Sequence, residues 1–147
     1  MASDLRLSRM LHVLLHMAQA KGPMTSETIA KMLGTNPVVV RRTMAGLRDA
    51  GYVRSEKGHG GGWAIAADLE EVTLLDIHRA VGDPPLVALG IAHPSPDCAV
   101  EAAVNAALAD AMREAEARLV TRLGSVTLAA LAREFEGRIC ENPKLAE

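Results

Sequence analysis

The chain has 147 residues, 49% hydrophobic and 23% charged, so it can bury the core of one domain and is too apolar for a disordered chain. Aromatic residues make up only 2%, which argues against a base-stacking surface for single-stranded nucleic acid and favours a mainly helical core. With no long apolar run, no signal-peptide core and only two cysteines, Cys98 and Cys140, we expect a reduced cytoplasmic protein without a membrane span or a disulfide framework.

The net charge of −2 is unevenly distributed along the chain. Residues 1–63 hold nine Lys or Arg and four Asp or Glu, whereas residues 64–147 hold seven Lys or Arg and fourteen Asp or Glu. This asymmetry predicts that the basic part meets a polyanion and that the acidic part is kept away from it by repulsion. Two ordinary solvated surfaces are the alternative, and charge alone does not decide between them.

Helical patterns alternate with short breaks at the start of the chain. Apolar residues at helical spacing predict an amphipathic helix over residues 4–20, which Lys21-Gly22-Pro23 ends. Thr25 or Ser26 can cap a second helix, and Gly34 ends it.

A third helix follows after a short turn. Asn36 is placed to cap it and Pro37 to occupy its first position, and the pattern continues to about Ala50. Two short helices joined in this way are typical of a helix-turn-helix. The expected buried face of the third helix consists of Val40, Met44 and Leu47.

A glycine-rich segment then separates two predicted short strands, residues 52–57 and 63–66. Such a segment predicts a β-hairpin, because glycine adopts the positive φ angles of tight turns. It matches neither a dinucleotide-binding nor a phosphate-binding loop, since a third fingerprint glycine would fall at Trp63 and no Gly-Lys-Ser/Thr is present. The expected fold class is therefore mainly α with a small β-hairpin: a winged helix-turn-helix domain followed by a long dimerisation helix.

The remaining chain is predicted to be helical around one loop rich in Pro and His. A helix starting at Thr73 runs to about Val81, a long helix spans residues 98–122, and Thr127 caps a last helix that ends near Phe135. The predicted domains are a winged helix-turn-helix domain at 1–82, a loop at 83–97, a dimerisation helix with a C-terminal helix at 98–136, and a tail at 137–147.

The long helix exceeds what the winged domain needs for its own core. The same helix of a second copy is the simplest partner that could bury its apolar stripe, which predicts a two-fold homodimer. Packing of the stripe within one chain is the alternative. The predicted dimer interface consists of Val100, Val104, Leu108, Met112, Ala115 and Leu119.

The third helix and the hairpin carry candidate contacts to double-stranded DNA. Arg can bond guanine at two atoms, an apolar side chain can meet a thymine methyl group, and hydroxyl groups at a helix start can bond phosphate. Ala45 and Gly46 are small, which is expected to let the helix approach DNA closely. A solvated surface residue is the alternative for any one of them. The candidate DNA-binding residues are Thr25, Ser26, Asn36, Pro37, Val38, Val39, Arg41, Arg42, Arg54, Lys57, His59 and Gly60.

Four segments together resemble one known family. They are residues 35–42 (TNPVVVRR), 47–53 (LRDAGYV), 58–63 (GHGGGW) and 72–81 (VTLLDIHRAV), and they resemble the BadM/Rrf-two family of bacterial transcriptional regulators. The resemblance covers residues 5–82 well and the long helix loosely. It implies a homodimeric winged-helix repressor or activator on a palindromic operator. Trp63 stands where the family usually has Tyr after the wing glycines.

Several members of that family sense through an iron–sulfur cluster held by three closely spaced cysteines near the start of the dimer helix. Here that region has only Cys98, and Cys140 lies much further along the chain. Ser8 and His12 stand where some relatives have other ligands, but Ser8 is a poor ligand and a cluster generally takes four. We therefore expect no iron–sulfur cluster and no other cofactor.

Two further side-chain features have more than one interpretation. His12 and His16 are four residues apart on one helix and could hold a metal ion, but no third ligand is nearby in sequence, so they are interpreted as surface or interface histidines. Cys98 stands at a helix start, where the helix dipole lowers a thiol pKa, so it is a candidate redox sensor. A small buried residue is the alternative for Cys98.

The leading hypothesis is a sequence-specific homodimeric transcriptional regulator, expected to be a repressor, that responds to redox state or to a small molecule. The alternative is a winged-helix module that binds an acidic protein and does not bind DNA. No nucleophile–base pair or paired carboxylate stands in a recognisable motif, so catalysis is not expected.

Overall fold

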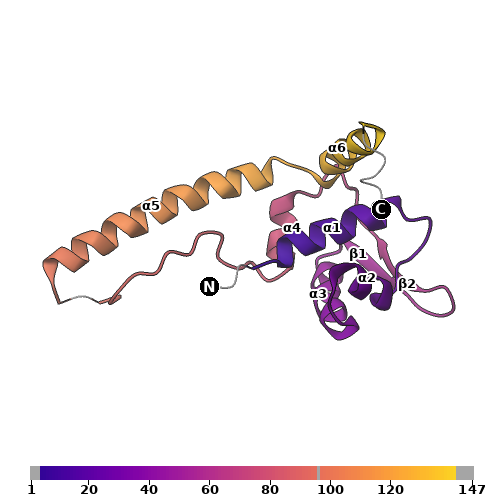
Figure 1. Cartoon of the computed structure of the whole chain (residues 1–147), viewed down its shortest axis with the longest axis horizontal. Coiled ribbons are helices and arrows are strands. Elements are labelled where there is room, and N and C mark those ends of the chain that lie inside the picture. The colour runs from indigo at the N-terminus through magenta and orange to yellow at the C-terminus, as the bar shows by residue number, and fades with distance from the viewer. Residues whose placement is uncertain (1–3, 96, 142–147) are drawn as a thin grey trace. The chain divides into compact units, whose positions relative to one another are not determined.

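The computed structural model describes residues 4–95 and 97–141, and in these residues the chain forms six helices and one two-stranded hairpin (Figure 1). The chain divides into two compact units. We call the chain up to Pro84 together with the chain from Gly124 the head unit, and Pro85–Leu123 the arm unit. In order, the elements are α1 (Arg6–Gln19), α2 (Ser26–Leu33), α3 (Pro37–Asp49), β1 (Val53–Glu56), β2 (Gly62–Ile65), α4 (Leu74–Ala80), α5 (Ala99–Gly124) and α6 (Leu128–Glu141).

The core of the head unit is built from one face of each helix and from the inner face of the hairpin. Leu14 of α1, Ile29 of α2 and Ile77 of α4 are each at most 1% exposed. Burying an aliphatic side chain of this size contributes roughly 1.5–3 kcal/mol to stability, so these faces hold the helices together. The predicted buried face of α3 is confirmed: Val40, Met44 and Leu47 are all buried.

The turn between α2 and α3 has the predicted capping groups. Gly34 ends α2 in the left-handed region with φ 62°, which costs glycine no steric strain. The Asn36 side chain accepts a hydrogen bond from the backbone N–H of Val39 at 3.0 Å, and Pro37 is the first residue of α3. These caps fix where α3 begins and therefore which of its side chains lie at its N-terminus.

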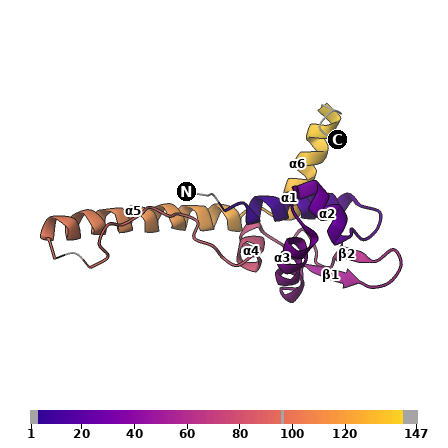
Figure 2. The ribbon, with the colours of Figure 1, turned by 60° about the horizontal axis from the view of Figure 1, so that its bottom comes forward.

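The predicted hairpin is present as β1 and β2, which pair antiparallel with Val53 opposite Ile65 (Figure 2). Met24, just before α2, exchanges two backbone hydrogen bonds with Trp63 of β2, at 2.9 and 2.8 Å. A Cβ atom on Gly62 would lie 2.6 Å from the carbonyl oxygen of Met24, so glycine is needed there. The hairpin is thereby fastened to the start of the helix-turn-helix.

Helix α6 belongs to the head unit, which differs from the predicted segment 98–136. Leu128 at its start is 2% exposed, and Thr127 pairs with Thr73 in an isolated β-bridge. The physical reason is that Leu128 completes the apolar core beneath α1 and α4, which periodicity within α6 could not reveal. The helix also continues to Glu141, so the predicted tail at 137–147 begins as helix, and residues 142–147 lie outside the described chain.

The arm unit consists of an irregular segment from Pro85 followed by α5. The Asn105 side chain donates hydrogen bonds to the carbonyl groups of Ala92 and His93, at 2.9 and 3.1 Å, and so holds part of that segment against the helix. No side chain of α5 is buried by the described residues. Within the described residues, every helix is too short or too polar to span a lipid bilayer.

Candidate nucleic-acid interface

The N-terminal turns of α3 present both apolar and basic side chains to solvent. Val38 is 58% exposed and Val39 is 44% exposed, although neighbouring Val40 is buried. Arg41 and Arg42 follow on the same surface and are exposed as well. Large apolar side chains left in water beside cations form the kind of surface that meets base edges and phosphates.

Arg41 and Arg42 differ in whether they form an ion pair with a described residue. A guanidinium nitrogen of Arg41 lies 3.6 Å from a carboxylate oxygen of Glu27 on α2, and both side chains are more than half exposed. Such an exposed pair contributes at most about 1 kcal/mol, so an incoming phosphate can replace Glu27 at low cost. Arg42 makes no ion pair with any residue that the structure describes. Arg42 is therefore the more available of the two for a base.

Asn36 and Thr25 each combine exposure with a capping role. The Asn36 side-chain oxygen is engaged by Val39, and the Thr25 hydroxyl accepts a hydrogen bond from the backbone N–H of Thr28 at 3.1 Å. Both residues are exposed at the N-terminal ends of their helices, where backbone N–H groups favour an anion. Thr25 and Asn36 therefore cap their helices, and both side chains are also exposed to solvent.

The structure corrects the expectation for Ser26. Its side chain is buried, and its hydroxyl accepts a hydrogen bond from the indole N–H of Trp63 at 3.0 Å. The cause is the pairing of Met24 with Trp63, which brings β2 against the start of α2 and encloses Ser26. Ser26 consequently supports the interface from within instead of presenting its hydroxyl to a phosphate.

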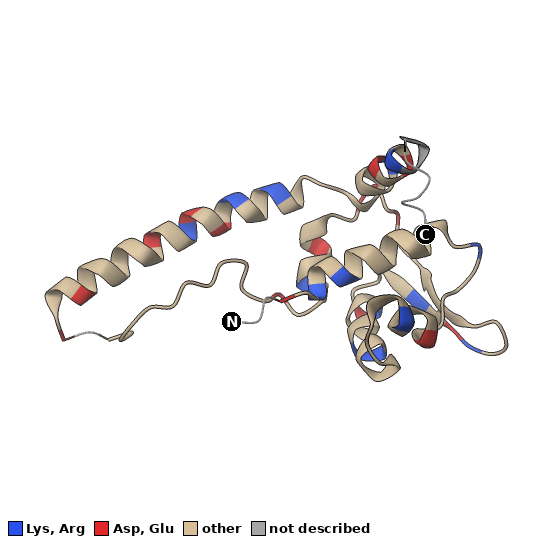
Figure 3. Ribbon diagram, viewed as in Figure 1, with Lys and Arg blue, Asp and Glu red and all other residues tan. Residues whose placement is uncertain are grey.

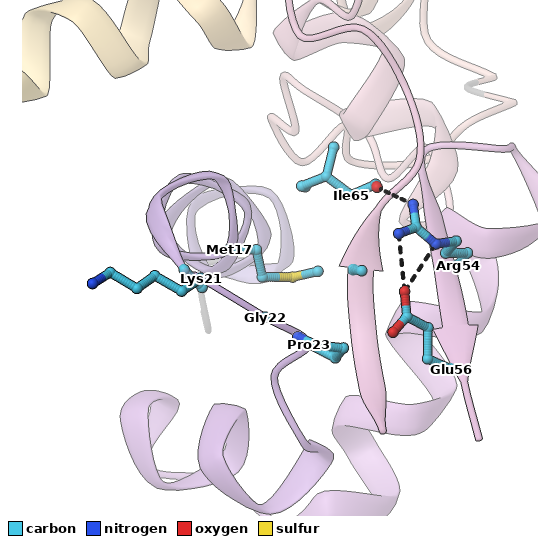
Figure 4. A pocket seen from close by; sticks show the side chains of 9 residues that line it. Met17, Lys21, Gly22, Pro23, Arg54, Glu56 and Ile65 are labelled. Carbon is cyan, nitrogen blue, oxygen red and sulfur yellow. Dashed lines mark hydrogen bonds and ion pairs between the residues drawn. The ribbon is translucent and has the colours of Figure 1, made fainter. Parts of the chain in front are cut away.

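The hairpin residues divide into a fixed arginine and a free tip. The Arg54 side chain donates hydrogen bonds to the Glu56 carboxylate at 2.9 and 3.1 Å and to the carbonyl oxygen of Ile65 at 2.8 Å. Figure 4 marks these bonds with dashed lines. Arg54 lines a pocket of about 380 Å³ between the end of α1 and the hairpin. Lys57, His59 and Gly60 are exposed at the tip. The tip residues are therefore the ones free to reach a phosphate backbone.

Sequence reasoning missed the two acidic partners, Glu27 and Glu56. Glu56 had a signal, because residues two apart on a strand share a face and this places it beside Arg54. Glu27 had none, because its pairing with Arg41 arises only when α2 packs against α3. Both partners leave their arginines on the surface but reduce their freedom.

The expected separation of basic and acidic parts is only partly present. Lys and Arg occur on α2, α3, β1 and the hairpin tip of the head unit (Figure 3). However, residues 64–84 of the same unit hold five Asp or Glu and one Arg. Residues 85–123, which form the arm unit, hold five Asp or Glu and three Arg. The largest acidic excess therefore lies in residues 64–84 of the head unit, while the arm unit has a smaller excess of two acidic residues. Most of the asymmetry thus separates segments of the head unit from one another.

Cys98 is exposed, so the alternative of a buried residue is wrong for this chain. Backbone N–H groups of Glu101 and Val100, at the start of α5, lower the pKa of its thiol below the ordinary value. These donors stabilise the thiolate, which is the nucleophilic form of cysteine. The exposure and the direction of the pKa shift are what a reactive cysteine needs.

The described residues do not fit an iron–sulfur cluster. Among them, no three His, Cys, Asp or Glu side chains are grouped closely enough to hold a metal ion together. Cys98 is the one cysteine whose side chain is described, whereas clusters are held mainly by several thiolates. The side chain of Cys140 lies outside the described part of the chain.

Comparison with known proteins gives consistent matches. The model of the Rrf2 family, described as iron-dependent transcriptional regulators, matches residues 4–134. YwnA of Bacillus subtilis strain 168, named as an HTH-type transcriptional regulator, is 29% identical over 123 residues, which cover 84% of this chain and 91% of YwnA. The match therefore includes both the helix-turn-helix and the arm.

Solved structures share the fold. CymR, the global cysteine regulator of B. subtilis, superposes with a TM-score of 0.59 at 23% identity, over 91% of this chain and 98% of CymR. IscR of T. potens superposes with a TM-score of 0.62 at 22% identity, over 91% of this chain and 88% of IscR. These similarities confirm the predicted winged-helix fold with its long additional helix. The family match favours a DNA-binding regulator over the protein-interaction module.

Proposed function

The chain belongs to the Rrf2 family of DNA-binding transcriptional regulators, and we propose that it acts as a homodimer that binds a palindromic operator and represses transcription in the bacterial cytoplasm. The observation that carries this proposal is the exposed N-terminus of α3, where Val38, Val39, Arg41 and Arg42 stand clear of the core. A recognition helix reads base edges with this part of its length.

Each exposed group has a role that fits its chemistry. We expect Arg42, which is unpaired among the described residues, to bond guanine at two atoms, and Val38 and Val39 to contact thymine methyl groups. Arg41 is expected to exchange Glu27 for a phosphate. The remaining contacts, to phosphate or to the minor groove, are assigned to Thr25, Asn36, Pro37, Lys57, His59 and Gly60.

The arm supports the homodimer. Val100 is 70% exposed, Val104 is 52% exposed and Leu119 is 40% exposed, and these side chains recur along α5 with Leu108, Met112 and Ala115. A helix of 26 residues with no buried side chain gains little stability within its own chain. A second copy of the same stripe would cover it with two-fold symmetry, and that symmetry would be matched by a palindromic operator.

The test is selection of an operator from a pool of random DNA duplexes, followed by affinity measurements at several salt concentrations. We expect a two-fold symmetric consensus and an affinity that falls steeply with salt, because binding releases counterions from phosphates. The Arg42→Ala variant should bind the consensus about 1–3 kcal/mol more weakly. Arg133→Ala is the matched control, because Arg133 is an exposed, ion-paired arginine on α6. Failure to enrich any sequence, with no salt dependence, would favour the protein-interaction module instead.

We further infer that this regulator works without an iron–sulfur cluster, because only one described thiol lies near the start of α5. Protein purified without oxygen should then show no visible absorption and no stoichiometric iron or sulfide. A cluster spectrum with stoichiometric iron and sulfide in the wild-type protein would contradict this inference, and its loss in Cys98→Ser would identify Cys98 as a ligand. Cys98 is then the proposed signal-sensing residue, through chemical modification of its thiol.

A further inference from the structure

Two histidine rings converge on the exposed side of α1. His12 and His16 are one helical turn apart, their Nε2 atoms are 3.0 Å apart, and their ring centroids are 4.8 Å apart. His12 is exposed and His16 is half-buried, with the ring of Phe135 from α6 at an edge-on centroid distance of 6.3 Å. The buried residues of α1 lie on its opposite face, so the two rings converge outside the main core. We propose that His12 and His16 together bind one Cu²⁺ or Ni²⁺ ion through their Nε2 atoms.

The distance between the two nitrogens decides which ions fit. With metal–nitrogen bonds of about 2.0–2.1 Å, a separation of 3.0 Å corresponds to a nitrogen–metal–nitrogen angle of about 91–97°. This is close to the right angle of square-planar and octahedral sites and well below the tetrahedral angle that Zn²⁺ prefers. Tetragonal sites with nitrogen and oxygen ligands are typical of Cu²⁺ and Ni²⁺, and imidazole binds both ions well.

The orientation of the two rings also suits a metal ion. An imidazole binds a metal ion through an unprotonated ring nitrogen, and the two Nε2 atoms already face each other. Without metal, the 3.0 Å contact between the two Nε2 atoms is a hydrogen bond in which one ring donates and the other accepts. On metal binding, the ring that donates must free its Nε2 by carrying its proton on Nδ1, so that both Nε2 lone pairs face the ion.

Water or a donor from another molecule completes the coordination. No third His, Cys, Asp or Glu side chain of the described residues joins the pair, so these residues leave the remaining positions of the ion open. The ring of Phe135 lies beside His16 and limits solvent there. This is a two-histidine chelate on α1, and it uses none of the residues assigned to DNA on α3 and the hairpin.

The experiment titrates full-length protein with Ni²⁺ in a calorimeter and with Cu²⁺ in an electron paramagnetic resonance spectrometer. The Cu²⁺ samples carry Cys98→Ser and Cys140→Ser, so that thiols do not reduce the ion. We expect one ion per chain and a Cu²⁺ spectrum with two equivalent nitrogen ligands. His12→Ala, at an exposed helical position, should weaken Ni²⁺ binding on the order of tenfold to a hundredfold. The reason is that the ion is then held by one imidazole and no longer by two imidazoles of the same chain.

His59→Ala is the matched control, since His59 is an exposed histidine on the hairpin tip, and it should leave binding unchanged. His16→Gln is a second test that keeps a polar group beside Phe135, and circular dichroism checks that both α1 variants remain folded. Equal Ni²⁺ affinity in wild type and His12→Ala, or a Cu²⁺ spectrum with a single nitrogen ligand, would overturn the proposal. Neither result depends on DNA binding, so it leaves the proposed function untouched.

Discussion

At the scale of single residues, several side chains of the interface serve the fold and the surface together. Asn36 caps α3 while lying exposed at its start, and Thr25 does the same for α2. Ser26 is the exception, because it is enclosed with Trp63. The sequence predicted the caps from residue type alone, whereas the enclosure of Ser26 depends on a strand almost forty residues further along the chain.

We predict that Ser26→Ala destabilises the head unit. The substitution would leave the indole N–H of Trp63 buried without an acceptor, and an unsatisfied buried donor costs about 1–3 kcal/mol. Chemical denaturation measures the loss. Thr28→Ala, at an exposed position two residues along the same helix, is the control and should have a smaller effect. Equal stability of wild type and Ser26→Ala would show that the bond contributes nothing.

The thiol of Cys98 gives a prediction about pH. Backbone N–H groups at the start of α5 lower its pKa, so thiolate should persist to lower pH than in an unfolded chain. The rate of alkylation by iodoacetamide, followed at Cys98 by peptide mass spectrometry, should therefore reach half its maximum below the ordinary thiol pKa. In the denatured protein the midpoint should move up. A native midpoint at or above the denatured one would show that the helix start does not activate this cysteine.

At the scale of elements, local signals located the helices well but did not assign their partners. The helix predicted to start at Thr73 is α4, where Thr73 and Asp76 cap each other reciprocally, and Gly34 ends α2 as expected. Periodicity, however, says which face of a helix is apolar and not what covers it. This is why α6 was grouped with the long helix, although Leu128 lies in the core of the head unit.

Gly46 illustrates the same limit within α3. The sequence predicts that its small size lets α3 approach DNA closely, but a Cβ atom there would lie 2.6 Å from the carbonyl oxygen of Ala80 at the end of α4. Its small size therefore serves the packing of two helices in the head unit. A sequence pattern cannot distinguish close approach to a neighbouring helix from close approach to a ligand.

We predict opposite effects for two Gly-to-Ala substitutions in helices. Gly46→Ala should destabilise the head unit by about 1–3 kcal/mol, because the added methyl group meets a backbone atom that cannot move freely. Gly137→Ala in α6 meets nothing within 4 Å and should stabilise the protein by up to about 1 kcal/mol through helix propensity. Thermal unfolding of both variants gives the comparison. Stabilisation by Gly46→Ala would mean that α4 readily moves away from α3.

At the scale of the whole molecule, the arm unit determines the expected assembly. Its apolar stripe along α5 is exposed or half-buried, and the head unit has a core that does not include it. A stripe of this kind was predictable from its three- and four-residue spacing. The homodimer was predicted because a second copy of α5 is the simplest partner that could bury this stripe. The sequence itself does not specify which molecule contacts a surface.

We predict that Val104→Asp converts the dimer into a monomer. A carboxylate placed in a two-fold contact would face its own copy without a partner, which costs several kcal/mol. Sedimentation velocity should show the loss of dimer, and affinity for the palindromic operator should fall while each half-site is still recognised. Ala106→Asp is the control, because this exposed residue lies off the stripe on the same helix. A Val104→Asp protein that stays dimeric would place the contact elsewhere.

The bridge between Thr73 and Thr127 determines when, during synthesis of the chain, the head unit can complete its folding. The core residue Leu128 follows the entire arm in the sequence, so the ribosome must synthesise the arm before the head unit can receive its last buried side chain. Closing a loop of this length costs conformational entropy that only the finished contact repays. A nascent chain stalled before Thr127 therefore carries a helix-turn-helix with an unfilled core, and its capacity to recognise an operator should emerge late in translation.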